Sequence, residues 1–467
     1  MTAAARPAAR PFVGIQMAPI SLVDEGVEHV LDLCRERAGV SAILYGAYSF
    51  SYANVGRASE AYPDHGVHER FALVGGAYFE PHPEVYAGTI LQPFRAPEPE
   101  FAGRDVLQET IDAARARDMA VYAWFFEAPP AHLARTVPNY AKVLEVDALE
   151  RPGRRPCFNH PDYRAHIRSY VEDVLNHYDV AGLMWGAERR GPLVNVLLSG
   201  DVAQAVCFCP HCRAAGQARG VDPERARQGY LALARHAAAL RRGERPVEGA
   251  FVPFLRLLLE YHEILGWEHL WTRSKHAVRA AIYGTAKAID PRREVGWHIW
   301  HQRSFSPLLR AEADYADFAP IADWIKPVVY DNPAGVRFRT HVLGLHRSVL
   351  GDLEPDQIAA ALYWINGLAE GPLDAIPATG WSPDYVERET RVAVARVGPD
   401  VPVYAGVGLN IPAGPGGKQT TPEAAYACTR AAIRAGARGL VVSRQYCEME
   451  LRNLAAVGRA LRDAGWR

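Results

Sequence analysis

Three of the seven cysteines in this chain fall within six residues, in the segment Cys207-Phe208-Cys209-Pro210-His211-Cys212. A Cys-x-Cys-x-x-Cys spacing can bring three thiolates round one ion, and Zn²⁺ prefers four soft or borderline ligands in a tetrahedron. Cys157 could supply the fourth ligand, whereas His211 stands between two ligands and is too constrained. A set of buried, reduced cysteines is the alternative, because the chain also has lone cysteines at Cys34, Cys428 and Cys447.

Three carboxylates stand at the ends of apolar, aromatic segments, namely Glu127, Glu188 and Asp331. Such carboxylates suit glycosidic bond cleavage, in which one carboxyl protonates the leaving oxygen and another attacks the anomeric carbon or activates water. We predict Glu188 as the general acid/base, since partial desolvation there would raise its pKa. Asp331 is the predicted nucleophile or base, with Glu127 as its substitute. Structural roles remain open: an ion pair of Glu188 with Arg189 or Arg190, and loop caps or arginine partners for the others.

The same segment ends carry side chains that could bind a sugar. Aromatic faces stack on sugar rings, and polar side chains bind hydroxyl groups. The predicted substrate-binding residues are Tyr45, Trp124, Trp185, Trp297, His298, Trp300, Tyr330 and Arg444. His298 could instead bind a metal together with His301, and Arg444 could form a structural ion pair.

Eight short apolar segments, rich in β-branched and aromatic residues, alternate with helical patterns. Their continuous apolarity is typical of strands that are covered on both faces of a parallel sheet. They are Phe12–Met17, Ala42–Phe50, Met119–Glu127, Gly182–Glu188, Glu294–His301, Trp324–Asn332, Val403–Asn410 and Gly439–Tyr446. Eight such units predict an α/β fold, a (β/α)8 TIM barrel with chemistry at the carboxyl ends of its strands. A doubly wound sheet is the alternative, but no Gly-x-Gly-x-x-Gly follows the first strand.

Two connections are unusually long and predict loop insertions after strands two and four. Residues 51–104 are rich in Gly, Pro, Tyr and His, and residues 189–292 contain the cysteine segment followed by charged helical patterns. Long loops in compact domains are usually functional or disordered, and the aromatic content favours order here. We therefore predict a disordered segment at 1–11 and one barrel domain at 12–467, with a helical insertion at about 213–290.

The composition is that of a soluble globular protein. The 467 residues are 49% hydrophobic and 22% charged, with a formal net charge of −1. Near neutrality argues against a nucleic-acid surface, which needs a basic excess. No apolar run approaches the roughly 18 residues of a membrane span, and the Ala/Pro/Arg-rich N-terminus has no apolar core of a signal peptide. We therefore expect a cytoplasmic protein without nucleic-acid or membrane partners; self-association as a homo-oligomer stays open.

The segment from Arg154 to Arg213 resembles glycoside hydrolase family 42, the β-galactosidases. The likeness lies in a Cys ahead of a Pro-x-Tyr-Arg segment, a strand that ends in Glu, and then Cys-x-Cys-x-x-Cys. The resemblance implies a (β/α)8 barrel with Glu188 as general acid/base and a structural Zn²⁺ on Cys157, Cys207, Cys209 and Cys212. The sequence departs from that family at Ala187, where the family has Asn, and in strand seven, which carries no carboxylate. Pairing Glu188 with Asp331 instead resembles the placement in the α-galactosidase clan.

These observations predict an enzyme that cleaves a small glycoside or oligosaccharide and needs no organic cofactor. One alternative is a metal-dependent lyase, isomerase or hydrolase that uses His298, His301, Glu188 and Asp331 as ligands. A second alternative is a carbohydrate-binding barrel without catalysis, because strand seven ends without a carboxylate that could act as nucleophile.

Overall fold

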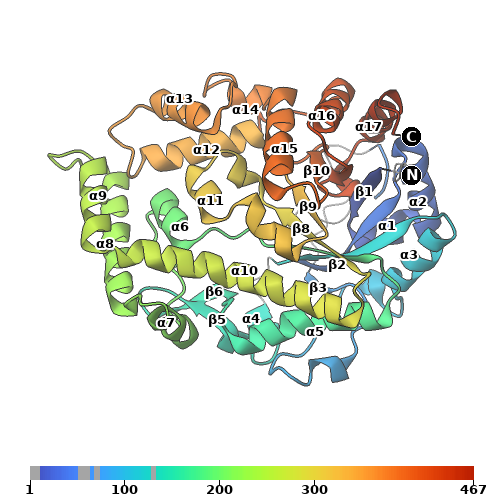
Figure 1. Cartoon of the computed structure of the whole chain (residues 1–467), viewed down its shortest axis with the longest axis horizontal. Coiled ribbons are helices and arrows are strands. Elements are labelled where there is room, and N and C mark those ends of the chain that lie inside the picture. Colours follow the sequence, from blue (N-terminus) through green and yellow to red (C-terminus); the bar gives the residue numbers. More distant parts are fainter. Residues whose placement is uncertain (1–10, 51–63, 68–73, 128–132, 467) are drawn as a thin grey trace, which may run out of the picture.

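The computed structural model describes residues 11–50, 64–67, 74–127 and 133–466. Within them, eight parallel strands form one sheet in the spatial order β10-β11-β1-β2-β4-β7-β8-β9 (Figure 1). The strands are β1 (Phe12–Met17), β2 (Ala42–Phe50), β4 (Ala120–Phe126), β7 (Gly182–Gly186), β8 (Glu294–Ile299), β9 (Trp324–Pro327), β10 (Tyr404–Gly408) and β11 (Gly439–Ser443). The sheet closes on itself, because the amide nitrogens of Ile325 and Val329 donate to the carbonyl oxygens of Pro402 and Gly406 at 3.0 and 3.1 Å. The predicted (β/α)8 barrel is confirmed.

The observed strands begin within one residue of the predicted starts, but several end earlier than predicted. The largest difference is in β9, which ends at Pro327 rather than at Asn332. Beyond Pro327, which has no amide hydrogen, pairing continues in single bonds: the amide nitrogen of Val328 donates to the carbonyl oxygen of Ile299 at 3.0 Å, and that of Val329 to the carbonyl oxygen of Gly406 at 3.1 Å. The carboxyl ends of the apolar segments beyond these bonds form the mouth of the barrel.

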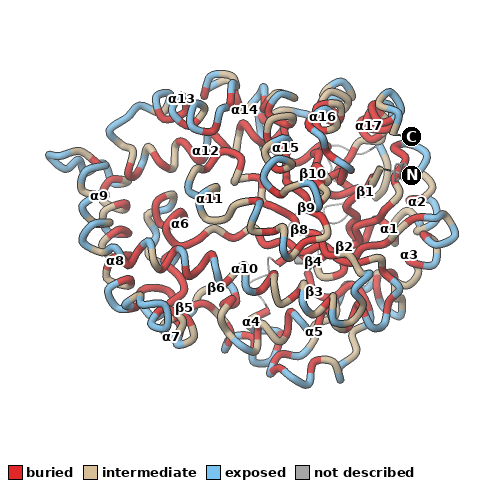
Figure 2. The backbone as a smooth tube through the Cα atoms, viewed as in Figure 1, coloured by how far each residue is buried: buried red, intermediate tan, exposed pale blue. Residues whose placement is uncertain are grey.

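Alternation along the strands divides their side chains between the barrel interior and the surrounding helices, since successive residues point to opposite faces. The interior cluster is mainly aromatic and aliphatic, and contains Ala42, Leu44, Tyr122, Trp124, Phe126, Met184, Trp324 and Val441. Glycine makes room for these rings: a Cβ at Gly296 would lie 2.2 Å from atoms of the Trp324 ring. The barrel is thus a packed core below its mouth, and the buried parts of the tube in Figure 2 converge on it.

Helices surround the barrel, each with its buried face towards the strands (Figures 1 and 2). The first group follows strands one to three: α1 (Pro19–Glu25), α2 (Val27–Ala38), α3 (Val106–Arg115), α4 (Leu133–Thr136) and α5 (Pro161–His177). The later group follows strands five to eight: α11 (Pro307–Glu312), α12 (Ala334–His346), α13 (Pro355–Asn366), α14 (Ile376–Thr379), α15 (Pro383–Val397), α16 (Pro422–Arg434) and α17 (Leu451–Asp463). None of the helices that the structure describes is both long enough and apolar enough to cross a bilayer.

Both predicted insertions are present. The connection after β2 contains the short strand β3 (Gly75–Ala77), antiparallel to β2, although residues 51–63 and 68–73 lie outside the described part. The connection after β7 contains α6 (Pro192–Ser199), α7 (Pro210–Gln217), α8 (Pro223–Arg241), α9 (Phe251–Glu260) and α10 (Glu263–Ile289). α10 contacts α5 and leads back to β8, so it is part of the barrel wall. The helices before it enclose a separate small core around the four clustered cysteines.

Candidate active site

Glu188 lies at the mouth of the barrel, two residues beyond the end of β7. Its Oε1 is 3.0 Å from Nε2 of His298, an interior residue of the neighbouring strand β8. The Glu188 side chain is 24% exposed, whereas the His298 side chain is 4% exposed. A ligand at the mouth could therefore reach the carboxylate but not the imidazole beneath it.

A buried lysine continues this contact into the barrel. Lys326 of β9 donates from Nζ to Oε1 of Gln16 at 2.5 Å and lies 3.3 Å from both Nδ1 of His298 and the hydroxyl of Tyr330. Because an ammonium or amine donor faces Nδ1, the proton of a neutral His298 belongs on Nε2, where it points to Glu188. Gln16, Lys326, His298 and Glu188 thus form one polar chain from the barrel interior to its mouth.

The charges around Glu188 keep it ionised. Burial raises the pKa of Glu188, but the hydrogen bond from His298 and the positive charges of Arg337 and Arg444 outweigh it, so that the pKa lies below its ordinary value. Burial and the charge of Lys326 lower the pKa of His298 to about 4. The raised pKa that we predicted for a resting acid is therefore wrong: at neutral pH Glu188 is a carboxylate beside a neutral imidazole.

Replacing His298 should reverse this balance. In His298→Phe the carboxylate loses its hydrogen-bond donor and stays partly buried, so the pKa of Glu188 should rise above its wild-type value. The midpoint of the Glu188 resonance in a ¹³C NMR titration measures this shift directly. As a control, His262→Phe changes an exposed histidine on the outer helices and should leave the midpoint unchanged. An unchanged midpoint in His298→Phe would show that His298 does not hold the carboxylate.

The other two predicted carboxylates form buried ion pairs. Asp331 is 2% exposed, and its Oδ2 accepts a hydrogen bond from Nζ of Lys418 at 2.8 Å. Glu127 is 3% exposed and is bound by Nη1 of Arg189 at 3.0 Å and by the Tyr163 hydroxyl at 2.8 Å. These contacts favour the structural roles that the sequence left open for both. Glu188 is thus the predicted carboxylate whose contacts suit chemistry, and it does not pair with Arg189.

Three predicted sugar-binding aromatics point away from the barrel mouth. Tyr45, Trp185 and Trp297 belong to the hydrophobic core between the strands and the helices. The Tyr45 hydroxyl donates to the carbonyl oxygen of Tyr78 at 2.6 Å, and Nε1 of Trp297 donates to that of Ile321 at 2.7 Å. Period-2 alternation explains this: Trp185 and Trp297 neighbour the interior positions Met184 and His298, so they face outward. Their predicted substrate-binding role is corrected accordingly.

The remaining predicted residues lie nearer to Glu188. Trp124 is an interior residue with its ring 6.5 Å from that of His298. The negative charge of Glu188 contributes to raising the pKa of Tyr330. Trp300 is half-buried with the Arg190 guanidinium 5.3 Å above its ring. Arg444 donates from Nε to Glu448 at 2.9 Å, so the structural ion pair is present, and its charge still acts on Glu188.

Three residues of the site were not predicted from the sequence, namely Gln16, Lys326 and Arg337. Gln16 and Lys326 are polar side chains inside otherwise apolar strand segments, and a polar residue at an interior position is a usable signal. Arg337 lies on α12, away from any strand end, and nothing in its local sequence marks it.

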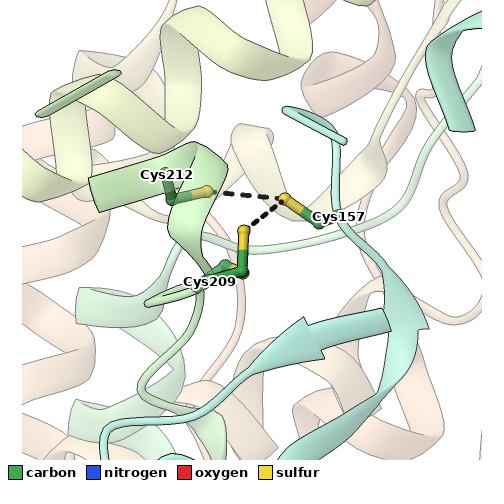
Figure 3. A group of neighbouring side chains, drawn as sticks. Cys157, Cys209 and Cys212 are labelled. Atoms are coloured by element: carbon green, nitrogen blue, oxygen red, sulfur yellow. Dashed lines mark hydrogen bonds between the residues drawn. The ribbon is translucent and has the colours of Figure 1, made fainter. Parts of the chain in front are cut away.

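The four predicted zinc ligands come together in a second site. Their sulfur atoms all lie within 4.8 Å of one another, and Sγ of Cys157 is 3.5 Å from Cys209 and 3.4 Å from Cys212 (Figure 3). Thiolates about 2.3 Å from Zn²⁺ lie about 3.8 Å apart in a tetrahedron, so the cluster has suitable dimensions. The amide nitrogens of Val146 and Asn159 donate to Cys207 and Cys157, each at 3.3 Å, as expected around thiolate ligands. This buried cluster could bind a metal such as zinc.

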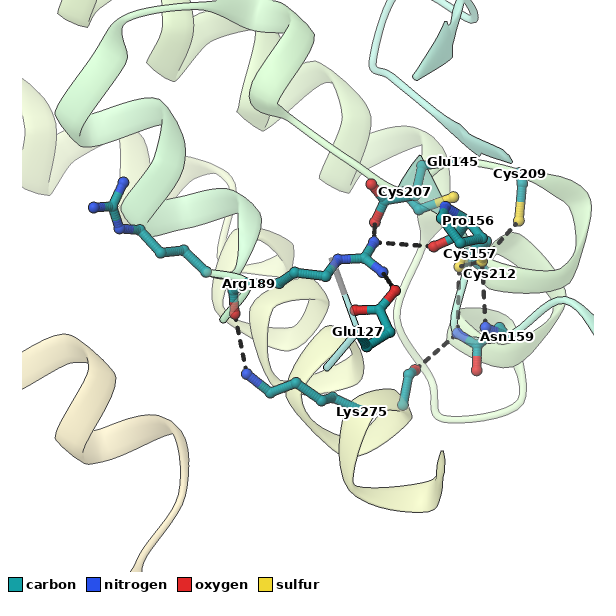
Figure 4. A network of polar contacts seen from close by, with 12 residues as sticks. Glu127, Glu145, Pro156, Cys157, Asn159, Arg189, Cys207, Cys209, Cys212 and Lys275 are labelled. Atoms are coloured by element: carbon teal, nitrogen blue, oxygen red, sulfur yellow. Dashed lines mark hydrogen bonds and ion pairs between the residues drawn. The ribbon is translucent and has the colours of Figure 1, made fainter. Parts of the chain in front are cut away.

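Arg189 joins the cysteine cluster to the barrel mouth (Figure 4). Its guanidinium binds Glu127 at the end of β4 at 3.0 Å and Glu145 in the hairpin strand β5 (Leu144–Val146) at 2.6 Å. Nη2 also donates to the carbonyl oxygen of Pro156, which ends strand β6 (Pro152–Pro156) and precedes Cys157. Glu188 is therefore adjacent in sequence to a residue that is fixed from three directions.

A zinc assay tests the cysteine cluster. We expect about one zinc per chain in purified protein and none in Cys207→Ser, because a tetrahedral structural site needs all four thiolates. Cys428→Ser is the matched control, since Cys428 is also buried but lies on α16 outside the cluster. Protein without metal, or equal metal in both variants, would support the alternative of reduced cysteines.

No family model and no curated protein matches the chain. Among solved structures, a β-galactosidase from the Antarctic haloarchaeon Halorubrum lacusprofundi is 16% identical, with a TM-score of 0.52 over 97% of this chain and 58% of that one. An α-L-fucosidase isoenzyme from Paenibacillus thiaminolyticus is 15% identical, with a TM-score of 0.51 over 97% and 49%. A β-galactosidase from the psychrophilic Marinomonas ef1 is 12% identical, with a TM-score of 0.52 over 97% and 60%.

This likeness concerns the fold. The chain spans about half to three-fifths of the length of these glycosidases, and its identity to them is low. It has a (β/α)8 barrel that is similar in fold to the barrels of these glycosidases. The resemblance to family 42 in particular remains a prediction.

Proposed function

We propose that the protein hydrolyses a glycosidic bond of a small glycoside and that Glu188 is its catalytic carboxylate. The observation that carries this proposal is an ionised, partly exposed carboxylate at the barrel mouth, held by a neutral histidine. The glycosidase-like fold supports the substrate class. The four cysteines would hold a structural zinc that fixes the loop beside Glu188 and takes no part in the reaction.

An ionised Glu188 can accept a proton from an attacking water, but it has no proton to give to the leaving oxygen. It would remove a proton from water as the water oxygen attacks the anomeric carbon and the bond to the leaving oxygen breaks; the leaving oxygen departs as an oxyanion and takes its proton from solvent water. His298 would keep the carboxylate in place. Tyr330 and Arg444, which interact electrostatically with the same carboxylate, would bind sugar hydroxyls.

The metal-dependent alternative has weaker support. Among the described residues, the groups close enough to share an ion are the four cysteines and a cluster of His82, Asp173 and His177, so the barrel mouth has no such group. His301 faces Arg337 instead, with Nδ1 3.0 Å from Nη1.

A carbohydrate-binding barrel without turnover is the second candidate. Its support is the end of β10, where Gly408, Leu409 and Asn410 provide no carboxylate, together with the buried ion pair of Asp331. Glycosidases usually place a second carboxyl group within about 10 Å of the first.

Turnover of aryl glycosides separates the two candidates. A nitrophenolate leaves without a proton, so these substrates need only the step assigned to Glu188. We expect the wild-type protein to release nitrophenol from at least one member of a panel of neutral and acidic sugars in both anomeric forms. Saturable binding of a sugar without release from any member would favour the binding protein and contradict the proposed hydrolysis.

A further inference from the structure

A cavity of about 310 Å³ adjoins the site on the side of α6 and α12. Its walls come from the connections after strands four, five and six, which are at the carboxyl end of the barrel. The polar side chains in its wall are mainly Arg190, Asn195, Gln302, Arg337, Thr340 and His341. Its size falls within the range of small-molecule pockets.

The charge of this cavity is entirely positive. Its described lining contains two arginines and no aspartate or glutamate. His341 adds no charge at neutral pH, because burial and the nearby Arg190 lower its pKa to about 4. The guanidinium groups of Arg190 and Arg337 therefore set the potential inside it.

Within the described part of the chain, neither arginine forms a direct ion pair with a carboxylate, although the charge of Glu188 partly offsets that of Arg337. Arg190 donates from Nε to Oε1 of Gln302 at 2.6 Å, and Arg337 contacts Nδ1 of His301 at 3.0 Å; both partners are neutral. Arg189, Arg310 and Arg444 by contrast bind carboxylates. Arg279, which is 6% exposed, also forms no direct ion pair among the described residues, but it lies against the rings of Trp185 and Phe318. A buried charge without a counter-ion is costly. Burial accordingly lowers the pKa of both Arg190 and Arg337.

We infer that this cavity is an anion subsite and that the substrate of Glu188 carries an acidic group bound between Arg190 and Arg337. The substrate part of this inference rests on the proposed hydrolysis. Arg337 links the two sites, because it lines the cavity and its charge also acts on the Glu188 carboxylate. A planar guanidinium pair suits a carboxylate, as in a uronic acid, or a sulfate or phosphate ester.

Direct binding tests the subsite without requiring turnover. Glucuronate and galacturonate are titrated against glucose and galactose by calorimetry, with inorganic sulfate and phosphate as free anions. We expect a uronate to bind at least tenfold more tightly than its neutral counterpart, and sulfate or phosphate to compete with it. Competition by the free anions shows that the acidic group itself is recognised rather than the sugar ring.

Variants then locate the site. Arg337→Met and Arg190→Met should each weaken uronate binding about tenfold or more, because each removes a charged hydrogen-bond donor. Arg339→Met, on the exposed side of the same helix α12, is the matched control and should bind as the wild type does. Equal affinity for uronates and neutral sugars, or equal effects of Arg337→Met and Arg339→Met, would overturn the inference.

The two proposals fail separately in this design. Uronate binding that depends on Arg337, without release from any aryl glycoside, keeps the anion subsite and contradicts the hydrolysis. Turnover of neutral aryl glycosides that is at least as fast as that of the matching aryl uronides, with both rates unaffected by Arg190→Met, keeps the hydrolysis and contradicts the acidic substrate.

Discussion

Glu188→Gln should lower kcat for the best aryl glycoside by about 10³-fold, the effect expected when a general base is removed. The amide keeps the size of the side chain and can still accept a hydrogen bond from His298, but it cannot take a proton. KM should change little, because the substrate ground state does not need the negative charge. Steady-state kinetics with nitrophenol release measures both parameters.

Asp331→Asn is the informative comparison for this result. Asp331 was the predicted partner of Glu188, but its carboxylate binds Lys418 in a buried pair. We expect Asp331→Asn to lower stability while retaining most of the activity per folded molecule. A loss of kcat in Asp331→Asn as large as that in Glu188→Gln would restore the two-carboxylate mechanism with Asp331 as nucleophile or base.

Arg189→Met should destabilise the fold by about 3–5 kcal/mol, the usual cost of leaving buried partners of an ion pair uncompensated. The variant removes the cation that binds Glu127 and Glu145, both of which are nearly inaccessible to solvent. Denaturant unfolding, followed by tryptophan fluorescence, measures the change in the free energy of unfolding.

Arg154→Met provides the control for that loss. Arg154 is an exposed residue of strand β6, in the same hairpin that Arg189 contacts through Pro156. We expect its substitution to change the free energy of unfolding by less than about 0.5 kcal/mol. Equal stability of the two variants would mean that the contacts of Arg189 with Glu127, Glu145 and Pro156 do not stabilise the packing of the hairpin on the barrel.

The sequence predicted the fold because the eight strand segments are apolar throughout, and burial on both faces demands that pattern. It also predicted the cysteine cluster, since three of its four cysteines are close in sequence. Glu188 was predicted because it follows an apolar segment at the end where barrel chemistry occurs.

Predictions for individual site residues failed for identifiable reasons. In a strand that is apolar throughout, the sequence does not show which side chains point into the barrel and which point outward. Trp185 and Trp297 are as apolar as their interior neighbours, so composition alone could not place them outside the barrel. Glu127 pairs with Arg189, and Asp331 pairs with Lys418. Both partners are distant in sequence, so no local sequence pattern indicates these ion pairs. The cavity beside the site joins three separate connections, so only the folded chain brings Arg190 and Arg337 together.

A crystal structure with a bound sugar tests the central claim most directly. Crystals are soaked with neutral monosaccharides and uronates, and the carboxylate nearest to the anomeric carbon is read from the map. We predict that Glu188 lies about 3–3.5 Å from the reacting water or carbon, with the acidic group of a uronate between Arg190 and Arg337. A sugar whose anomeric carbon faces Asp331 or Glu127, or that binds away from Glu188, would contradict the assignment of Glu188 as the catalytic carboxylate.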